Sequence, residues 1–149
     1  MNENQTEGPA EQTIRGVLVT VTHQVRDVEI PTADTLSGLY EVIGAEMVEK
    51  VSLPCDPALD MWCDEEGLLA WPAFRNPVAE YIASYWFTHP TDDQAIALDP
   101  EDLPIYVGDV VFLGSRSGEI ADVPEGFASV RQAAEVIAAS LRGEIRTAS

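Results

Sequence analysis

Apolar and polar residues alternate in several stretches of the chain, and this two-residue period is typical of β-strands. The clearest case is the stretch DMWCDEEG, in which Met61 and Cys63 alternate with Asp60, Trp62 and Asp64 before an acidic turn. The pattern predicts strands at residues 16–22, 25–30, 47–53, 59–64, 68–71 and 105–113.

Other stretches place apolar residues every three to four positions, which is the helical period. Thr32 or Asp34 is a suitable N-cap for one helix, and Gly44 a suitable end. Asn76 directly before Pro77 is typical of another helix start. Helices are therefore predicted at residues 34–43, 77–87 and 127–141. Together the elements predict an α+β fold, with a small mixed or antiparallel sheet of five to six strands and two to three helices.

The polar start of the chain has no such periodicity. We expect residues 1–13 to be a disordered acidic tail and residues 14–149 to form a single α+β domain. The sequence shows neither a long apolar run nor a basic start followed by an apolar segment, which argues against a membrane span and a secretory signal. Two cysteines, Cys55 and Cys63, fit a reducing compartment, so we expect a cytoplasmic protein.

The net charge is the property of the sequence that bears most on function. The chain has 26 acidic and 8 basic residues, a formal net charge of -18. Between residues 51 and 110, twelve acidic residues and one basic residue give a local net charge of -11. Such a surface should repel nucleic acids and anionic membranes and attract basic proteins. An acidic host proteome would give similar totals without any special partner.

Four segments, IGAEMVEKVSL, DMWCDEEGLL, NPVAEYIA and YVGDVVFLG, carry a resemblance to a known group of proteins. Over roughly residues 15–115 the chain resembles a family of small proteins of unknown function that recurs in phages, notably those of actinobacteria, and on plasmids. The acidic tail and the C-terminal helix lie outside this resemblance. It implies a mobile genetic element in a bacterial host cell, and it carries over no catalytic residue.

Sequence motifs for catalysis are missing. The chain contains no GxxxxGK[ST], HExxH or GxSxG motif, and His23 and His89 have no recognisable partner spacing. Cys55 and Cys63 lie eight positions apart, without the CxxC spacing typical of zinc sites. We therefore predict no enzymatic activity, metal or cofactor. As an alternative, the acidic turn after residue 63, with Asp92 and Asp93, could form a small-molecule or metal-binding site.

Trp62 allows two interpretations, because its ring lies on the acidic side of the predicted strand. Either a helix covers this side, or the indole is an aromatic anchor among carboxylates that bind a basic partner. The first is the usual environment of a large aromatic side chain.

The function predicted from these features is that of an acidic, phage-type interaction protein, which binds a basic surface of a host protein. In a sharper form of this hypothesis it is a DNA mimic that inhibits a nucleic-acid-binding or defence protein. A homodimer is compatible with the sequence, and a plain soluble accessory protein is a further alternative. The predicted partner-binding residues are Asp60, Trp62, Asp64, Glu65, Glu66, Asp92, Asp93, Asp99, Glu101 and Asp102.

Overall fold

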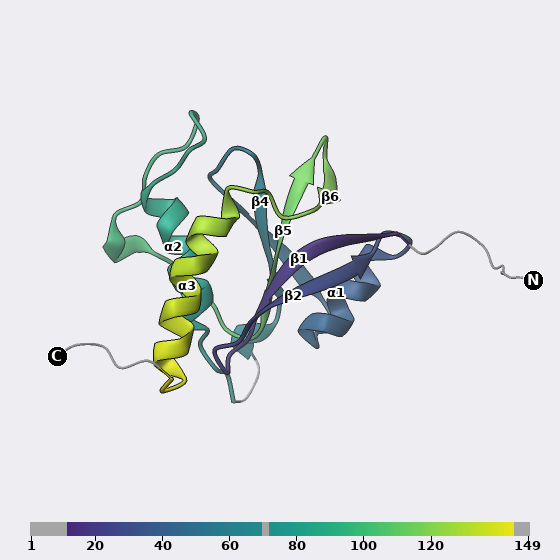
Figure 1. Cartoon of the computed structure of the whole chain (residues 1–149), viewed down its shortest axis with the longest axis horizontal. Helices are drawn as coiled ribbons and strands as arrows, with labels where there is room; N and C mark the ends of the chain where they lie inside the picture. Colours follow the sequence, from purple (N-terminus) through teal and green to yellow (C-terminus); the bar gives the residue numbers. More distant parts are fainter. Residues whose placement is uncertain (1–11, 70–71, 145–149) are drawn as a thin grey trace, which may run out of the picture.

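One antiparallel sheet organises the protein (Figure 1). The computed structural model describes residues 12–69 and 72–144. The strands are β1 (Thr13–Val19), β2 (Val25–Pro31), β3 (Val48–Leu53), β4 (Leu59–Asp64), β5 (Val110–Arg116) and β6 (Glu119–Ala121). The helices are α1 (Thr35–Ile43), α2 (Pro77–Thr88) and α3 (Phe127–Leu141), with 3-10 turns η1 (Gly67–Leu69) and η2 (Pro100–Asp102). The strand order is β2-β1-β5-β4-β3, and β6 pairs with β5. The predicted α+β fold is confirmed.

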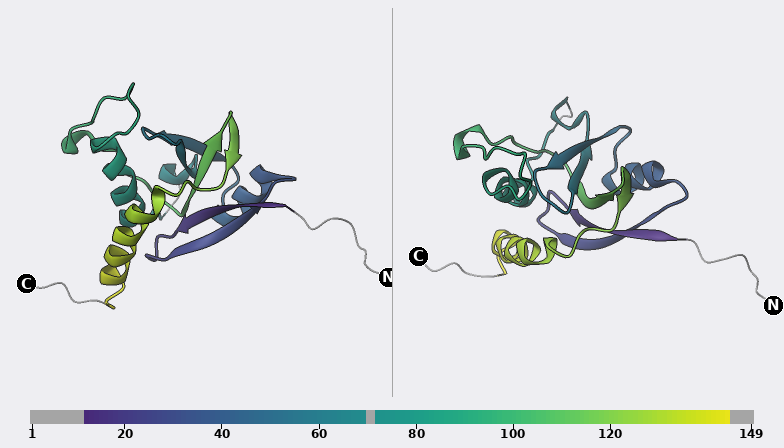
Figure 2. Two further views of the ribbon diagram at one scale, coloured as in Figure 1. Left: turned by 45° about the horizontal axis from the view of Figure 1, so that its top comes forward. Right: turned by 90° about the horizontal axis from the view of Figure 1, so that it is seen from above.

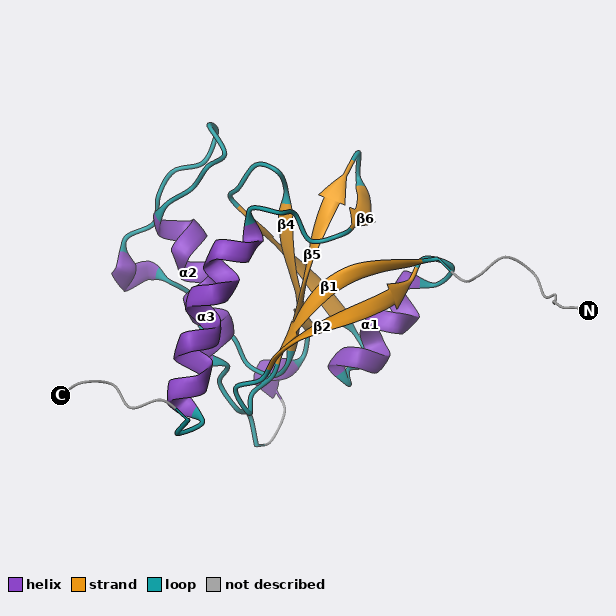
Figure 3. Ribbon diagram, viewed as in Figure 1, coloured by secondary structure: helices purple, strands orange, loops and turns teal. Residues whose placement is uncertain are grey.

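Helices cover both faces of the sheet (Figures 2 and 3). On β5, Val110 and Phe112 belong to the core cluster beneath α2 and α3, whereas Val111 and Leu113 belong to the cluster beneath α1. Side chains alternate across a strand, so a central strand between two helical layers is buried on both sides. The described part of the chain has no helix long and apolar enough to cross a membrane.

The prediction of a strand at residues 68–71 is wrong for residues 68 and 69, which the structure describes. Gly67–Leu69 forms η1, in which the Leu69 N–H donates to the Glu66 carbonyl at 2.9 Å. Residues 70–71 lie outside the described residues. β4 already pairs with β3 on one edge and β5 on the other, so it has no free edge for a third partner.

Other boundaries also move. β5 begins at Val110 instead of residue 105, after Gly108 with its positive φ of 83° interrupts the extended chain. β6 was not predicted. β1 starts at Thr13, the last residue of the predicted tail, and residues 1–11 of that tail lie outside the described residues. The single-domain organisation stays a prediction.

Asn76 fixes the start of α2, as the Asn-Pro pair predicted. Its side-chain oxygen accepts from the Ala79 N–H at 3.1 Å. Its amide nitrogen donates to the carbonyls of Val19 at 3.0 Å and Gly108 at 2.9 Å. One fully buried side chain therefore joins α2, β1 and the segment before β5.

The segment before α3 crosses β5 in close contact. A Cβ atom at Gly114 would lie 2.2 Å from the Asp122 carbonyl oxygen, so only glycine fits there. The Arg15 N–H donates to Asp122 Oδ1 at 2.7 Å, and the Val123 N–H donates to the Arg15 carbonyl at 2.9 Å. These contacts place the start of α3 beside β1.

Candidate functional site

The acidic turn after β4 lies beside the segment before β3, residues 44–47, at one end of the sheet. The register of the β3–β4 hairpin pairs Val48 with Asp64, and the Glu65 N–H donates to the Met47 carbonyl at 3.0 Å. Asp64 Oδ1 in turn accepts from the Glu66 N–H at 2.9 Å, which shapes the turn. Strand pairing thus brings residues 44–47 next to residues 64–66.

Between these two segments lies an open hollow of about 360 Å³. Glu46, Asp64 and Glu66 line it together with Leu69, whose side chain is 82% exposed. Met47, beside the hollow in sequence, is also exposed. We call this surface the β4-end patch, and its members are Glu46, Met47, Asp64, Glu65, Glu66 and Leu69.

Two of the predicted partner-binding residues are buried instead of exposed. Trp62 is 9% exposed and belongs to the cluster of Leu39 and Ile43, which come from α1. Asp60, on the same side of β4, is 4% exposed. The interpretation in which a helix covers Trp62 is therefore confirmed, and the interpretation as an exposed anchor is wrong, because α1 covers this face of the strand.

The remaining predicted residues lie in an exposed segment that follows α2. It is anchored by the N–H groups of Thr91 and Asp92, which donate to the Pro54 carbonyl at 3.0 and 3.3 Å. Its apolar Ile96 is 88% exposed. The exposed carboxylates of this segment belong to Asp92, Asp93, Asp99, Glu101 and Asp102.

The two acidic regions lie at opposite ends of β4. Pro54 precedes the start of β4, and the β4-end patch follows its last residue, Asp64. A six-residue strand spans about 20 Å. In Figure 1 the segment after α2 is at the upper left and the end of β4 is at the bottom. The predicted residues therefore do not form one continuous face.

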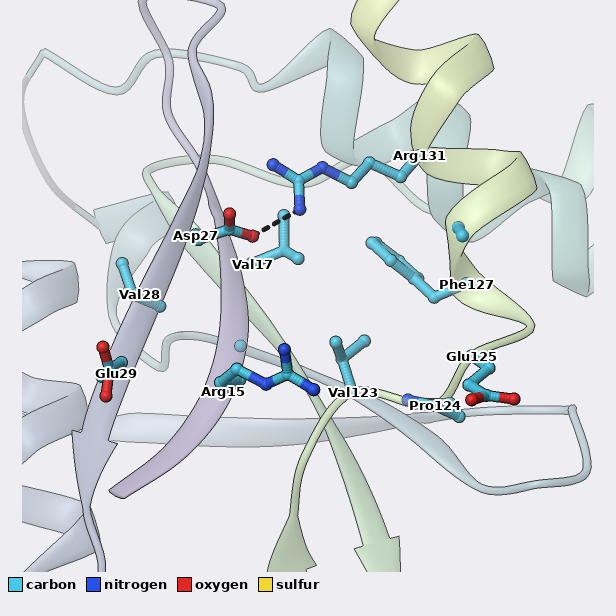
Figure 4. A pocket seen from close by; sticks show the side chains of 12 residues that line it. Arg15, Val17, Asp27, Val28, Glu29, Val123, Pro124, Glu125, Phe127 and Arg131 are labelled. Atoms are coloured by element: carbon cyan, nitrogen blue, oxygen red, sulfur yellow. Dashed lines mark hydrogen bonds and ion pairs between the residues drawn. The ribbon is translucent and has the colours of Figure 1, made fainter. Parts of the chain in front are cut away.

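A cavity of about 390 Å³ lies between the β1–β2 hairpin and the start of α3 (Figure 4). Val17 and Phe127, both buried, give it an apolar floor, and Val123 lies beside them. Arg15 and Arg131 lie on two sides of this floor. Two of the few arginines of this acidic chain thus meet at one cavity.

The cysteines lack the chemistry of a nucleophile. Burial raises the pKa of the Cys55 thiol to about 11, and burial beside Glu49 raises that of Cys63 to about 12. Both are therefore protonated at neutral pH, and a thiol reacts as its thiolate. Among the described residues, no group of three or more histidine, cysteine or acidic side chains is arranged to hold a metal ion.

Sequence reasoning missed the residues that complete both hollows. The sequence predicts Met47 at the start of a strand, places Glu46 in no element, and predicts Leu69 in a strand that does not form. Their position at the acidic turn follows from the β3–β4 register, which the hairpin-like spacing of the two strands would have suggested. The rarity of basic residues in this chain is the feature of the sequence that could have drawn attention to Arg15 and Arg131.

These features define an acidic antiparallel α+β domain with helices on both faces of its sheet and no recognisable catalytic centre in the described residues. Residues 14–136, more than half of the chain, match the family described as "Domain of unknown function (DUF3846)", and the chain belongs to this family. No match was found among curated proteins or among solved structures.

The family match confirms the expected membership of a family of unknown function. The match extends beyond residue 115 into α3. The expectation that the whole C-terminal helix lies outside the family is therefore wrong for residues 127–136. Phage, plasmid or actinobacterial origin stays a prediction.

Proposed function

We propose that this protein is a non-enzymatic interaction protein, and that its β4-end patch binds a basic surface of another protein. The observation that carries the proposal is the hollow lined by Glu46, Asp64 and Glu66, with exposed Leu69 at its edge. The hollow combines carboxylates from two segments that are distant in sequence with an apolar side chain that packs against little of its own chain.

This combination suits a lysine or arginine side chain of the partner. Such a side chain has an apolar stem and a charged tip, so it can contact Leu69 along its length and reach the carboxylates with its end. The field of the whole chain, with its net charge of -18, would accelerate the encounter with a basic protein.

In its sharper form, the proposal is that the partner is a nucleic-acid-binding or defence protein in the cytoplasm of a bacterial host, and that this chain occupies its DNA-binding surface. The acid excess supports this form. The second acidic segment, at the other end of β4, would then contact the same partner about 20 Å away.

The test begins with affinity capture from a bacterial lysate, followed by binding measurements with the purified captured protein. Two matched variants separate the acidic regions. One carries Asp64→Asn, Glu65→Gln, Glu66→Gln and Leu69→Ser; the other carries Asp92→Asn, Asp93→Asn, Asp99→Asn and Ile96→Ser. Each removes three charges and one exposed apolar side chain.

We expect the first variant to lose affinity by about tenfold or more and the second by much less, because the first variant changes residues that line the hollow. Raising the salt concentration from about 50 to 500 mM should slow association with the wild-type chain by screening. Competition with duplex DNA tests the sharper form. Equal losses of affinity in both variants, or an affinity that does not change with salt concentration, would contradict the proposal.

A further inference from the structure

We propose that the cavity between the β1–β2 hairpin and α3 binds a small organic carboxylate with an apolar body, such as a short aliphatic or aryl acid. This site is separate from the β4-end patch and does not depend on the function proposed for it. The inference rests on the placement of two arginines around an apolar floor in a strongly acidic protein (Figure 4).

Arg131 is held in place and gives the cavity one fixed wall. Its guanidinium pairs with Asp27 at 2.5 Å and with Glu135 at 3.7 Å, and its side chain is 23% exposed. Because these carboxylates compensate its charge, Arg131 shapes the cavity more than it attracts an anion.

Arg15 is the group available to a ligand. Its backbone is fixed by hydrogen bonds to Asp122 and Val123, whereas its guanidinium has no ion-pair partner among the residues that the structure describes. Figure 4 shows this guanidinium directed toward Val123, in the space beneath Phe127. A planar guanidinium recognises a carboxylate through two parallel hydrogen bonds.

Asp27, Glu29 and Glu125 line the cavity together with the two arginines, and none of them forms an ion pair with Arg15 among the described residues. Asp27 is paired with Arg131, and Glu29 Oε1 accepts a hydrogen bond from the Thr13 hydroxyl at 2.6 Å. In Figure 4, Glu29 lies on the far side of Arg15 from the apolar floor. The three carboxylates of the lining and the net charge of -18 on the whole chain repel anions, so a monoanion held by the Arg15 guanidinium is favoured over a phosphate or another multiply charged anion.

The rest of the cavity selects for an apolar body. Val17, Val123 and Phe127 form its apolar lining. Phe127 itself is fixed by stacking on Trp86, with ring centroids 5.9 Å apart, and by Phe112 at 5.3 Å. The volume of about 390 Å³ falls within the usual range of small-molecule sites. A carboxylate on Arg15 would therefore place its hydrocarbon part against this lining.

The experiment is an NMR titration of the full chain with hexanoate and benzoate, compared at equal ionic strength with hexanol and benzyl alcohol. We expect saturable shifts at the amides of Val17, Val123 and Phe127, and at least about tenfold weaker binding of the alcohols, since a charged hydrogen-bonding partner is lost. Arg15→Gln should weaken the binding of both acids by about tenfold.

Arg26→Gln is the matched control, because Arg26 is an exposed arginine on β2 that does not line the cavity. It should change the affinity by less than about twofold. Acids and alcohols that bind equally well, an absence of saturable shifts at these amides, or equal effects of Arg15→Gln and Arg26→Gln would overturn the proposal. If Arg15→Gln does not fold, the comparison of acids with alcohols on the wild-type chain decides the question.

Discussion

The two faces of the sheet bury polar side chains in opposite ways. On the face covered by α2 and α3, Asn76 is completely buried and its amide makes three hydrogen bonds to backbone groups. On the face covered by α1, Trp62 is almost as deeply buried, but its Nε1–H has no hydrogen-bond partner among the described residues. Asn76 therefore stabilises the fold through its polar atoms, and Trp62 through its apolar ring.

The difference follows from the size of the two helical layers. The nine-residue α1 contributes only Leu39 and Ile43 as buried side chains, so the large indole of Trp62 fills much of the space beneath the helix. The opposite face receives side chains from two longer helices, including Ile82 and Phe127. A small layer gains enough from a bulky ring to accept an unpaired N–H group.

The largest effect is expected for Trp62→Ala. Removal of the indole leaves a cavity under a helix that has few other contacts, so the free energy of unfolding should fall by about 3–5 kcal/mol. Urea denaturation followed by circular dichroism measures this change. Affinity per folded molecule for any partner of the β4-end patch should stay unchanged, because Trp62 is covered by α1.

Trp62→Phe is the control that separates volume from hydrogen bonding. It retains an aromatic ring and removes an N–H group that lacks a partner, so the loss of stability should be well below that of Trp62→Ala. A loss as large as that of the alanine variant would show that the indole N–H is hydrogen-bonded in solution, and the contrast between the two faces would then fail.

A smaller loss is expected for Asn76→Ala. The change removes the N-cap of α2 and leaves the carbonyls of Val19 and Gly108 without this donor, which should cost about 2–3 kcal/mol in the same denaturation assay. Asn76→Ser keeps an acceptor for the Ala79 N–H, so it should recover part of the loss. If serine and alanine destabilise equally, the cap contributes little and the two carbonyl contacts dominate.

Local patterns predicted much of the fold, since each depends on neighbours in sequence. The cap at Asn76 and the alternation in β4 are examples, and both elements formed where predicted. Local patterns left two environments open for Trp62 on β4 and could not decide between them, because the covering of both faces depends on the strand order, which places β4 between β3 and β5. For the same reason, the sequence could not distinguish buried Asp60 from exposed Glu65, although both belong to one acidic stretch.

The candidate sites depend even more on distant contacts. Glu46 and Glu66 line one hollow only because β3 and β4 pair in a particular register. Arg15 and Arg131 come from opposite ends of the chain and meet because the segment before α3 is bound to β1. Local charge counts therefore pointed to acidic segments but could not show which residues line the same hollow.

The third prediction concerns alkaline pH and again separates the two faces. Burial raises the pKa of Cys55 to about 11 and those of Cys63 and Tyr106 to about 12, and all three pack with the face covered by α2 and α3. In the unfolded chain a thiol has a pKa of about 8.5 and a tyrosine one of about 10. The unfolded chain therefore releases these protons at lower pH than the folded one, which favours unfolding.

Stability from these three groups should be fully present below about pH 8 and should fall progressively as the pH rises toward 11–12, where the folded chain also ionises. Urea midpoints measured between about pH 7 and 11 would follow this fall. The double variant Cys55→Ala, Cys63→Ala should lose less stability over this interval than the wild-type chain, and Trp62→Phe, which alters the α1 face, should lose as much as the wild type. If the double variant shows the full loss, the two thiols must be solvated in the folded protein, and the apolar character assigned to the face beneath α2 and α3 would be wrong at Cys55 and Cys63.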